Sequence, residues 1–317
     1  MTAFLLTSAL GCETIAVQMA PARAPATAPD VAHQAEQALM TPLLAGDYAA
    51  LPQALEQLTA LAVAHPRNAR VHLMLGMAHL WALAERGRVE QPPATVTNHA
   101  VLSRHYLESA RALDGSDARI PGWSGSAGLV ISSLLEDEKL KRQSYFMIKN
   151  GARSWPEFNK FTLSYTMSRL THDDERFTSD VVEPMFETMD LCFGVPLDVD
   201  KPDWAAATRA VEAFVKRQDS VSPRQRVCRN SAVVPRNLEG YFMHFGDVLT
   251  KAGRPNDARN ALALARLAPH HAQWAFKDAL EERISRAEER VKELQAAKKG
   301  EGMMVTSTMA CVGCHQR

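Results

Sequence analysis

The sequence lacks the patterns that build β-sheets and the motifs of several large enzyme classes. Alternation of β-branched with polar residues at a period of two is nearly absent, so we expect no sheet. The chain also has no nucleophile elbow, no glycine-rich loop that would hold a phosphate and no H-E-x-x-H zinc motif. We therefore assign no catalytic residue from the sequence.

An excess of charge of either sign is also missing. Among 317 residues, 36 Lys and Arg balance 36 Asp and Glu. Such a chain has no basic field to attract nucleic acid, so we exclude nucleic acid as a partner. Beyond the N-terminus, no stretch approaches the roughly 18 consecutive apolar residues of a membrane-spanning helix. The length suffices for a substantial core, in one large domain or two smaller ones.

What the sequence has instead is a long helical pattern. From about 31 to 299 it is rich in Ala, Leu, Glu, Arg and Met, with Gly, Pro, Asn and Asp clusters between helical stretches. We expect loops at 87–99, 193–203 and 219–235, and one long charged helix from 272 to about 299. The pattern predicts an all-α protein made of antiparallel helix pairs.

Two stretches place small and bulky residues as helix-pair repeats do at their crossings. The first runs from Ala54 to Leu75-Gly76, and the second from Phe245-Gly246 to Pro269. Residues 106–114 also look like the end of a repeat's second helix. In these positions the sequence resembles the tetratricopeptide-repeat family. The resemblance implies a stacked α-α superhelix with a surface for protein docking, and a generic helical solenoid is the alternative.

One short motif indicates chemistry. Cys311-Val312-Gly313-Cys314-His315 has the C-x-x-C-H spacing of a c-type haem attachment site. We expect one covalent haem c, with thioethers to Cys311 and Cys314 and with His315 as an axial iron ligand. A zinc or copper site and a redox-active disulfide are the alternatives. Neither a second cysteine pair at zinc-finger spacing nor a βαβ pattern around the motif is present to favour them.

The motif leaves the second axial ligand of the iron open. Two residues follow it in this sequence, so we expect the other haem contacts to come from upstream residues or from a partner. A methionine ligand, Met303 or Met304, would raise the reduction potential, whereas a histidine would lower it. The histidine candidates on the helical body are His244, His270 and His271. An open sixth position would favour small-ligand or peroxide chemistry.

The N-terminus and the remaining cysteines suit an exported protein. Residues 1–12 form an apolar run that ends in Ala-Leu-Gly-Cys and resembles a bacterial lipoprotein signal, with Cys12 as the lipidated residue. An uncleaved N-terminus is the alternative. The Ala- and Pro-rich residues 13–30 predict an extended tether. In an oxidising compartment Cys192 and Cys228 are expected to form a disulfide, with two buried free thiols as the alternative.

Together these patterns predict four segments: a signal at 1–12, a tether at 13–30, a helical-repeat domain at 31–299 and a flexible haem-binding tail at 300–317. The predicted protein is a monohaem c-type cytochrome of the bacterial periplasm, anchored by lipid to the outer membrane or to the outer face of the inner membrane. It would transfer electrons or sense redox state with a protein partner, rather than act as an enzyme. The alternatives are a scaffold for an envelope complex with a structural haem, and a haem enzyme with an open iron site.

Overall fold

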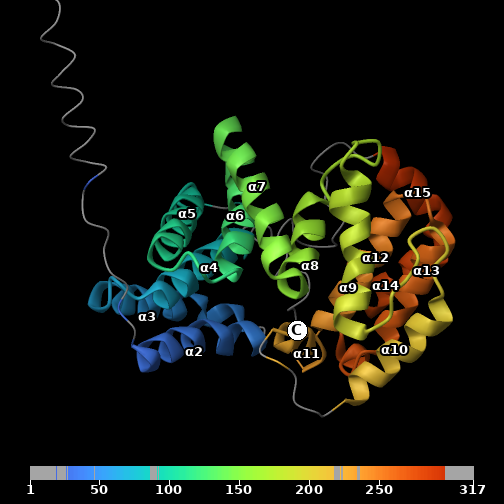
Figure 1. Ribbon diagram of the computed structural model, residues 1–317, viewed down its shortest axis with the longest axis horizontal. Coiled ribbons are helices and arrows are strands. Elements are labelled where there is room, and N and C mark those ends of the chain that lie inside the picture. The colour runs from blue at the N-terminus through green and yellow to red at the C-terminus, as the bar shows by residue number, and fades with distance from the viewer. Residues whose placement is uncertain are drawn as a thin grey trace, which may run out of the picture.

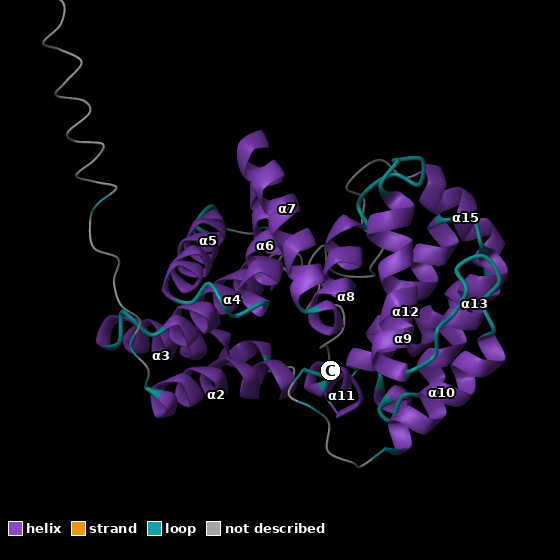
Figure 2. Ribbon diagram, in the orientation of Figure 1, coloured by secondary structure: helices purple, strands orange, loops and turns teal. Residues whose placement is uncertain are grey.

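The protein is built from helices throughout the part that the structure describes. The computed structural model describes residues 28–45, 47–85, 93–217, 224–233 and 236–296, with a few isolated positions outside them. Within these ranges every regular element is a helix and no strand occurs (Figure 2). The predicted all-α fold is confirmed. No helix of these ranges combines the length and the apolar character that crossing a bilayer would take.

The helices fall into two groups along the chain (Figure 1). Those of the first group are α2 Pro29–Ala45, α3 Leu51–Ala64, α4 Ala69–Glu85, α5 Val96–Leu113, α6 Arg119–Leu135, α7 Glu138–Ser154 and α8 Pro156–Met167. Those of the second group are α9 Glu183–Phe193, α10 Trp204–Lys216, α11 Arg226–Val233, α12 Asn237–Lys251, α13 Pro255–Leu264, α14 Lys277–Ser285 and α15 Ala287–Ala296. Short 3-10 turns, among them η4 Ala265–Leu267 and η5 His271–Gln273, and one π-helical turn, η3 Thr178–Val182, lie between them.

Local sequence sets several helix ends. The Asp137 side chain accepts a hydrogen bond from the backbone N–H of Leu140 at the start of α7, and Asp203 does the same for Ala206 at the start of α10. Pro156 occupies the first turn of α8, where its missing N–H costs nothing. Gly194 ends α9 with a φ of 69°, a left-handed conformation that glycine adopts without strain.

Helices α2 to α9 stack as successive pairs in two layers. Each even-numbered helix packs on its pair partner and on the next even-numbered helix, whereas the odd-numbered helices mainly contact their neighbours in sequence. Figure 1 shows α3, α5 and α7 standing apart from one another along the row. This is the arrangement by which stacked helix pairs bury faces that a single pair leaves exposed.

Glycines allow close helix crossings. A Cβ on Gly76 of α4 would lie 2.8 Å from Cγ of Leu107 in α5, and the Ser103 hydroxyl donates to the Gly76 carbonyl at 2.9 Å. Gly246 of α12 meets Leu262 of α13 so closely that a Cβ would overlap it. Gly76 and Gly246 belong to the two stretches in which the sequence resembles helix-pair repeats. Their small-residue crossings are therefore present in the structure.

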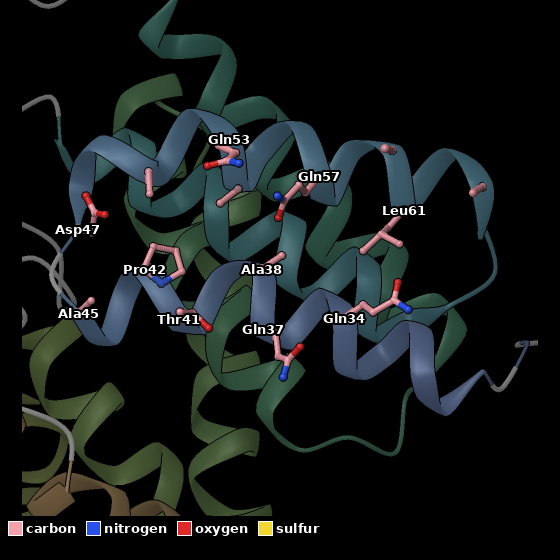
Figure 3. Close-up of a pocket in the computed structure, with 14 residues that line it drawn as sticks. Gln34, Gln37, Ala38, Thr41, Pro42, Ala45, Asp47, Gln53, Gln57 and Leu61 are labelled. Atoms are coloured by element: carbon pink, nitrogen blue, oxygen red, sulfur yellow. The ribbon is translucent and has the colours of Figure 1, made fainter.

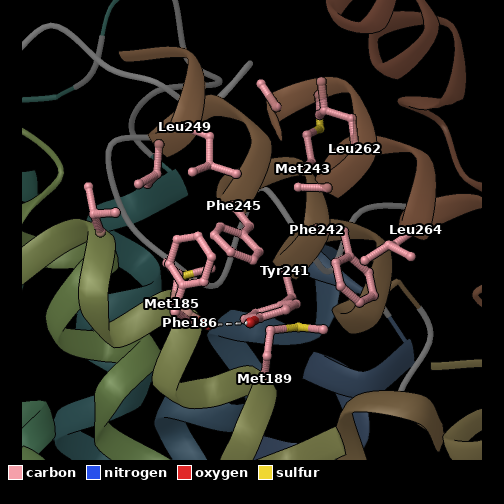
Figure 4. Close-up of a cluster of buried hydrophobic side chains, with 14 of the residues drawn as sticks. Met185, Phe186, Met189, Tyr241, Phe242, Met243, Phe245, Leu249, Leu262 and Leu264 are labelled. Atoms are coloured by element: carbon pink, nitrogen blue, oxygen red, sulfur yellow. Dashed lines mark hydrogen bonds between the residues drawn. The ribbon is translucent and has the colours of Figure 1, made fainter. Parts of the chain in front are cut away.

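Helix α12 forms the centre of the second group. Every residue from Leu238 to Lys251 is buried, because α11, α13 and α15 pack on the helix and side chains of α9 contact it. Figure 4 shows Phe186 and Met189 of α9 against the aromatic side chains of α12. The Tyr241 hydroxyl of α12 donates to the Met185 carbonyl at 3.0 Å, so this buried hydroxyl has a hydrogen-bond partner.

Three expected boundaries differ from the structure. The expected loop at 193–203 matches the gap between α9 and α10. The expected loop at 87–99 is too long, because α5 already begins at Val96. The expected loop at 219–235 contains a helix, α11. The expected helix from 272 to 299 is split into α14 and α15 at Arg286. No glycine or proline marks that break, so residue patterns could not locate it.

Candidate functional site

Most of the predicted haem and lipid sites lie outside the described residues. These are Cys12, Met303, Met304, Cys311, Cys314 and His315. Helix α15 ends at Ala296, so fifteen residue steps separate it from Cys311. A chain of that length spans at most about 50 Å.

His244 lies in the interior, on α12. Its side chain is 0% exposed and is enclosed by the rings of Phe161 and Tyr165 of α8, with ring centroids 5.6 and 4.9 Å away. Burial lowers the pKa of His244 to about 3, so the ring is neutral at physiological pH. Neither ring nitrogen has a hydrogen-bond partner within the described residues. A haem outside the fold has no path to this ring while α8 and α12 stay packed.

His270 and His271 lie nearer the surface, at the turn between α13 and α14. Both are partly exposed, and the ring of His271 is 6.2 Å from that of Trp274. Burial lowers the pKa of His271, which favours the neutral ring that an iron ligand needs. Of the three histidines that the sequence offers as candidate iron ligands on the helical body, these two are accessible from the surface.

A buried carboxyl group lies beside His270. Glu239 of α12 is buried, and the backbone of His270 is one of the groups that favour its charged form. Burial raises the pKa of Glu239 to about 7, although Arg236 and the hydrogen bonds oppose the shift. The carboxyl therefore changes charge near neutral pH, which sequence reasoning had not indicated.

Cys192 and Cys228 form a disulfide, as predicted. Their Cα atoms are 5.2 Å apart, and the bond joins the end of α9 to α11. Phe193, Phe214 and Val227 pack around the bond. The disulfide thus anchors the eight-residue helix α11, which has few other contacts, to the core.

Two hollows lie on the first group of helices. A groove of about 830 Å³ runs between α2 and α3, lined by Gln34 and Gln37 from one helix and Gln53 and Gln57 from the other (Figure 3). Six alanines also line it. Asp47 adds one carboxylate to the lining, and the amide and methyl groups suit contact with another polypeptide.

The second hollow, of about 270 Å³, lies between α5 and α7 above α6. It presents Arg111 and Gln143, while Arg104 is paired with Glu108 at 2.9 Å. No cluster of three or more metal-binding side chains occurs here or elsewhere in the described ranges.

Sequence reasoning missed a group of rings on α4 and α5. His72 and His79 are seven residues apart on α4, and His99 and Tyr106 are seven apart on α5. That spacing puts each pair on one helix face, two turns apart. The signal was present in each helix, but the contact between the helices depends on their register, which the sequence alone does not give.

Comparison with known proteins found no family, no curated protein and no solved structure that matches this chain. In the part that the structure describes, the fold and the Cys192–Cys228 pair define an all-α array of helix pairs with a disulfide. Any functional assignment must therefore rest on the chain's own residues.

Proposed function

We propose that this protein is an exported, tetratricopeptide-like monohaem cytochrome of the c type. Cys311 and Cys314 would hold the haem through thioethers, and the His315 imidazole would ligate the iron. The observation that carries the proposal is the C-x-x-C-H spacing of these residues. When bound, such a haem supplies one-electron redox chemistry at its iron.

The disulfide supports export. Covalent haem attachment by this motif and a stable structural disulfide both suit a compartment outside the reducing cytosol. Cys192 and Cys228 are 36 residues apart in sequence, and their bond joins α9 to α11, which suits a structural disulfide. Together with the lipoprotein-like residues 1–12, it favours a periplasmic protein held to a membrane by lipid on Cys12.

The helical body supports a docking role. Stacked helix pairs present long surfaces that recognise other proteins. The groove between α2 and α3, with its four glutamines, offers such a surface without strong charge. We assign it to a protein partner, which would be the redox partner of the haem or another subunit of an envelope complex.

The exposure of the histidines on the helical body narrows the candidates for the second axial ligand of the iron. His244 is enclosed, whereas His270 and His271 are partly exposed. We therefore favour His270 or His271 over His244 among the histidines, with Met303 and Met304 as the sulfur alternatives nearer the haem motif.

The test is to express the full chain with bacterial cytochrome c maturation machinery. We expect a reduced spectrum with a sharp α-band, and a haem mass on the peptide that contains residues 311–315. Replacing both Cys311 and Cys314 with Ser should abolish covalent haem. The matched variant that replaces Cys192 and Cys228 should keep it, because those thiols are paired elsewhere.

Carbon monoxide separates the alternatives. An unshifted spectrum means two axial ligands and favours electron transfer, whereas a shifted one means an open iron site and favours a haem enzyme. Exported chain with both terminal thiols unmodified would overturn the cytochrome proposal and leave a helical docking scaffold.

A further inference from the structure

Four aromatic rings form a ladder along the contact between α4 and α5. His79 and Tyr106 are stacked, with an interplanar angle of 5° and ring centroids 5.7 Å apart. His72 lies 5.8 Å from Tyr106 on one side, and His99 lies 5.3 Å from His79 on the other. The rings are held by two helices that pack closely through Gly76 and Leu107, so their positions are fixed by rigid elements.

The end of the ladder brings two nitrogen atoms together. Nδ1 of His79 and Nδ1 of His99 are 3.0 Å apart. Metal–imidazole bonds are about 2.0–2.1 Å long, so two cis nitrogens on one ion lie roughly 2.9–3.4 Å apart. The observed separation therefore fits two ligands of one ion as well as it fits a hydrogen bond.

The two rings are also in the protonation state that a metal requires. Burial, followed by the neighbouring His99, lowers the pKa of His79 to about 4. Burial lowers the pKa of His99 as well. Both imidazoles are then uncharged near neutral pH, and an incoming ion has only the shared Nδ1 proton to displace.

Access to the pair comes from the side of His99. His79 is 7% exposed and is locked by its stack on Tyr106, whereas His99 lies partly exposed in the first turn of α5. One ring is thus pre-positioned and the other faces solvent. No group of three or more metal-binding side chains occurs within the described ranges, so water would complete the coordination.

We propose that His79 and His99 form a binding site for one divalent transition-metal ion, held by both Nδ1 atoms, with Cu²⁺ bound most tightly. Imidazole nitrogen suits copper, nickel and zinc, and Cu²⁺ leads the affinity order of these ions at a given nitrogen site. The remaining open positions suit the tetragonal nitrogen and oxygen coordination of Cu²⁺. The proposal does not depend on haem at the C-terminal motif.

The test is a Cu²⁺ titration of the full chain by calorimetry and electron paramagnetic resonance. Iodoacetamide without reductant first blocks the free thiols, so that Cys311 and Cys314 are silent and the Cys192–Cys228 bond is kept. We expect a Cu²⁺ site with two-nitrogen splitting. His99→Gln should weaken that site at least tenfold and remove the two-nitrogen splitting.

His105→Gln is the matched control. His105 is an exposed residue of α5 whose ring also contacts Tyr106, at 5.1 Å, but it lies away from the nitrogen pair. It should leave the titration unchanged. His99 is partly exposed, so His99→Gln should keep the wild-type circular dichroism. Added Cu²⁺ should raise the melting temperature of wild type and of His105→Gln, but not that of His99→Gln.

Three results would overturn the proposal. They are the absence of a two-nitrogen Cu²⁺ site in wild type, equal Cu²⁺ affinity and splitting in His99→Gln, and an equal loss of both in His105→Gln. In each case the His79–His99 contact is a hydrogen bond only.

Discussion

Arg283 of α14 donates from Nε to both carboxylate oxygens of Asp247 in α12, at 2.9 and 3.1 Å, inside the molecule. Arg290 of α15 reaches the same carboxylate at 3.1 Å. Asp247 is fully buried, so it has no water to replace either partner. One carboxylate therefore joins α14 and α15 to the central helix on both sides of the break at Arg286.

Asp247→Asn should destabilise the protein by about 3–5 kcal/mol, because it leaves the buried Arg283 guanidinium without its counter-charge. The measurement is the free energy of unfolding in urea. Glu281→Gln is the control, since its ion pair with Arg266 is exposed and should be worth about 1 kcal/mol or less. Equal losses in the two variants would show that the buried pair has no special weight.

His244→Phe should remove part of the protein's sensitivity to acid. The pKa of His244 is about 3 in the folded protein and near 6.5 when unfolded. The unfolded chain thus binds more protons between these values, and stability present above pH 6.5 is lost as pH falls, by up to about 1.4 kcal/mol per pH unit. The aromatic enclosure should accept the new ring.

Urea unfolding at pH 7.5 and at pH 5 tests this directly. The stability difference between the two pH values should be smaller in His244→Phe than in wild type, and unchanged in the exposed control His105→Gln. Parallel pH profiles for wild type and His244→Phe would mean that His244 is protonated as easily in the fold as outside it.

Glu239→Gln should stabilise the protein at high pH, because the stability contribution of Glu239 depends on pH in the direction opposite to that of His244. Burial raises the pKa of Glu239 to about 7 from 4.5, so the folded protein binds more protons between these values. Its contribution is therefore present below pH 4.5 and is lost as pH rises to 7. We expect the variant to gain about 1–3 kcal/mol over wild type at pH 8 and little at pH 4. A gain that is the same at both pH values would contradict the assignment.

Gly246→Val should weaken the crossing of α12 and α13 by about 1–3 kcal/mol, because the new side chain overlaps Leu262. Thermal melting measures the loss. Gly115→Ala is the control, since the nearest atom to a Cβ at Gly115 is the Arg111 carbonyl oxygen at an ordinary 3.7 Å. If Gly246→Val melted at the same temperature as Gly115→Ala, the crossing of α12 and α13 would not need a glycine at position 246.

The helical composition was enough to predict the all-α class, and small residues such as Gly76 and Gly246 marked two of the crossings. The disulfide was predicted from the roles expected of the other three cysteines, which left Cys192 and Cys228 to pair. Helix α11 was missed because eight residues between proline-containing turns carry too little periodicity. The nitrogen pair of His79 and His99 was missed for a different reason. It depends on the register between α4 and α5, which tertiary packing decides.

The complete burial of α12 has a consequence for how the chain is made. A ribosome delivers helices in order, and α13 and α15, which cover α12, are the last helices of the described part to appear. The row from α2 to α9 has its neighbours at hand during synthesis. Residues 238–251 find α9 and α11 already made, but the faces of α12 that turn to α13 and α15 stay uncovered until those helices emerge.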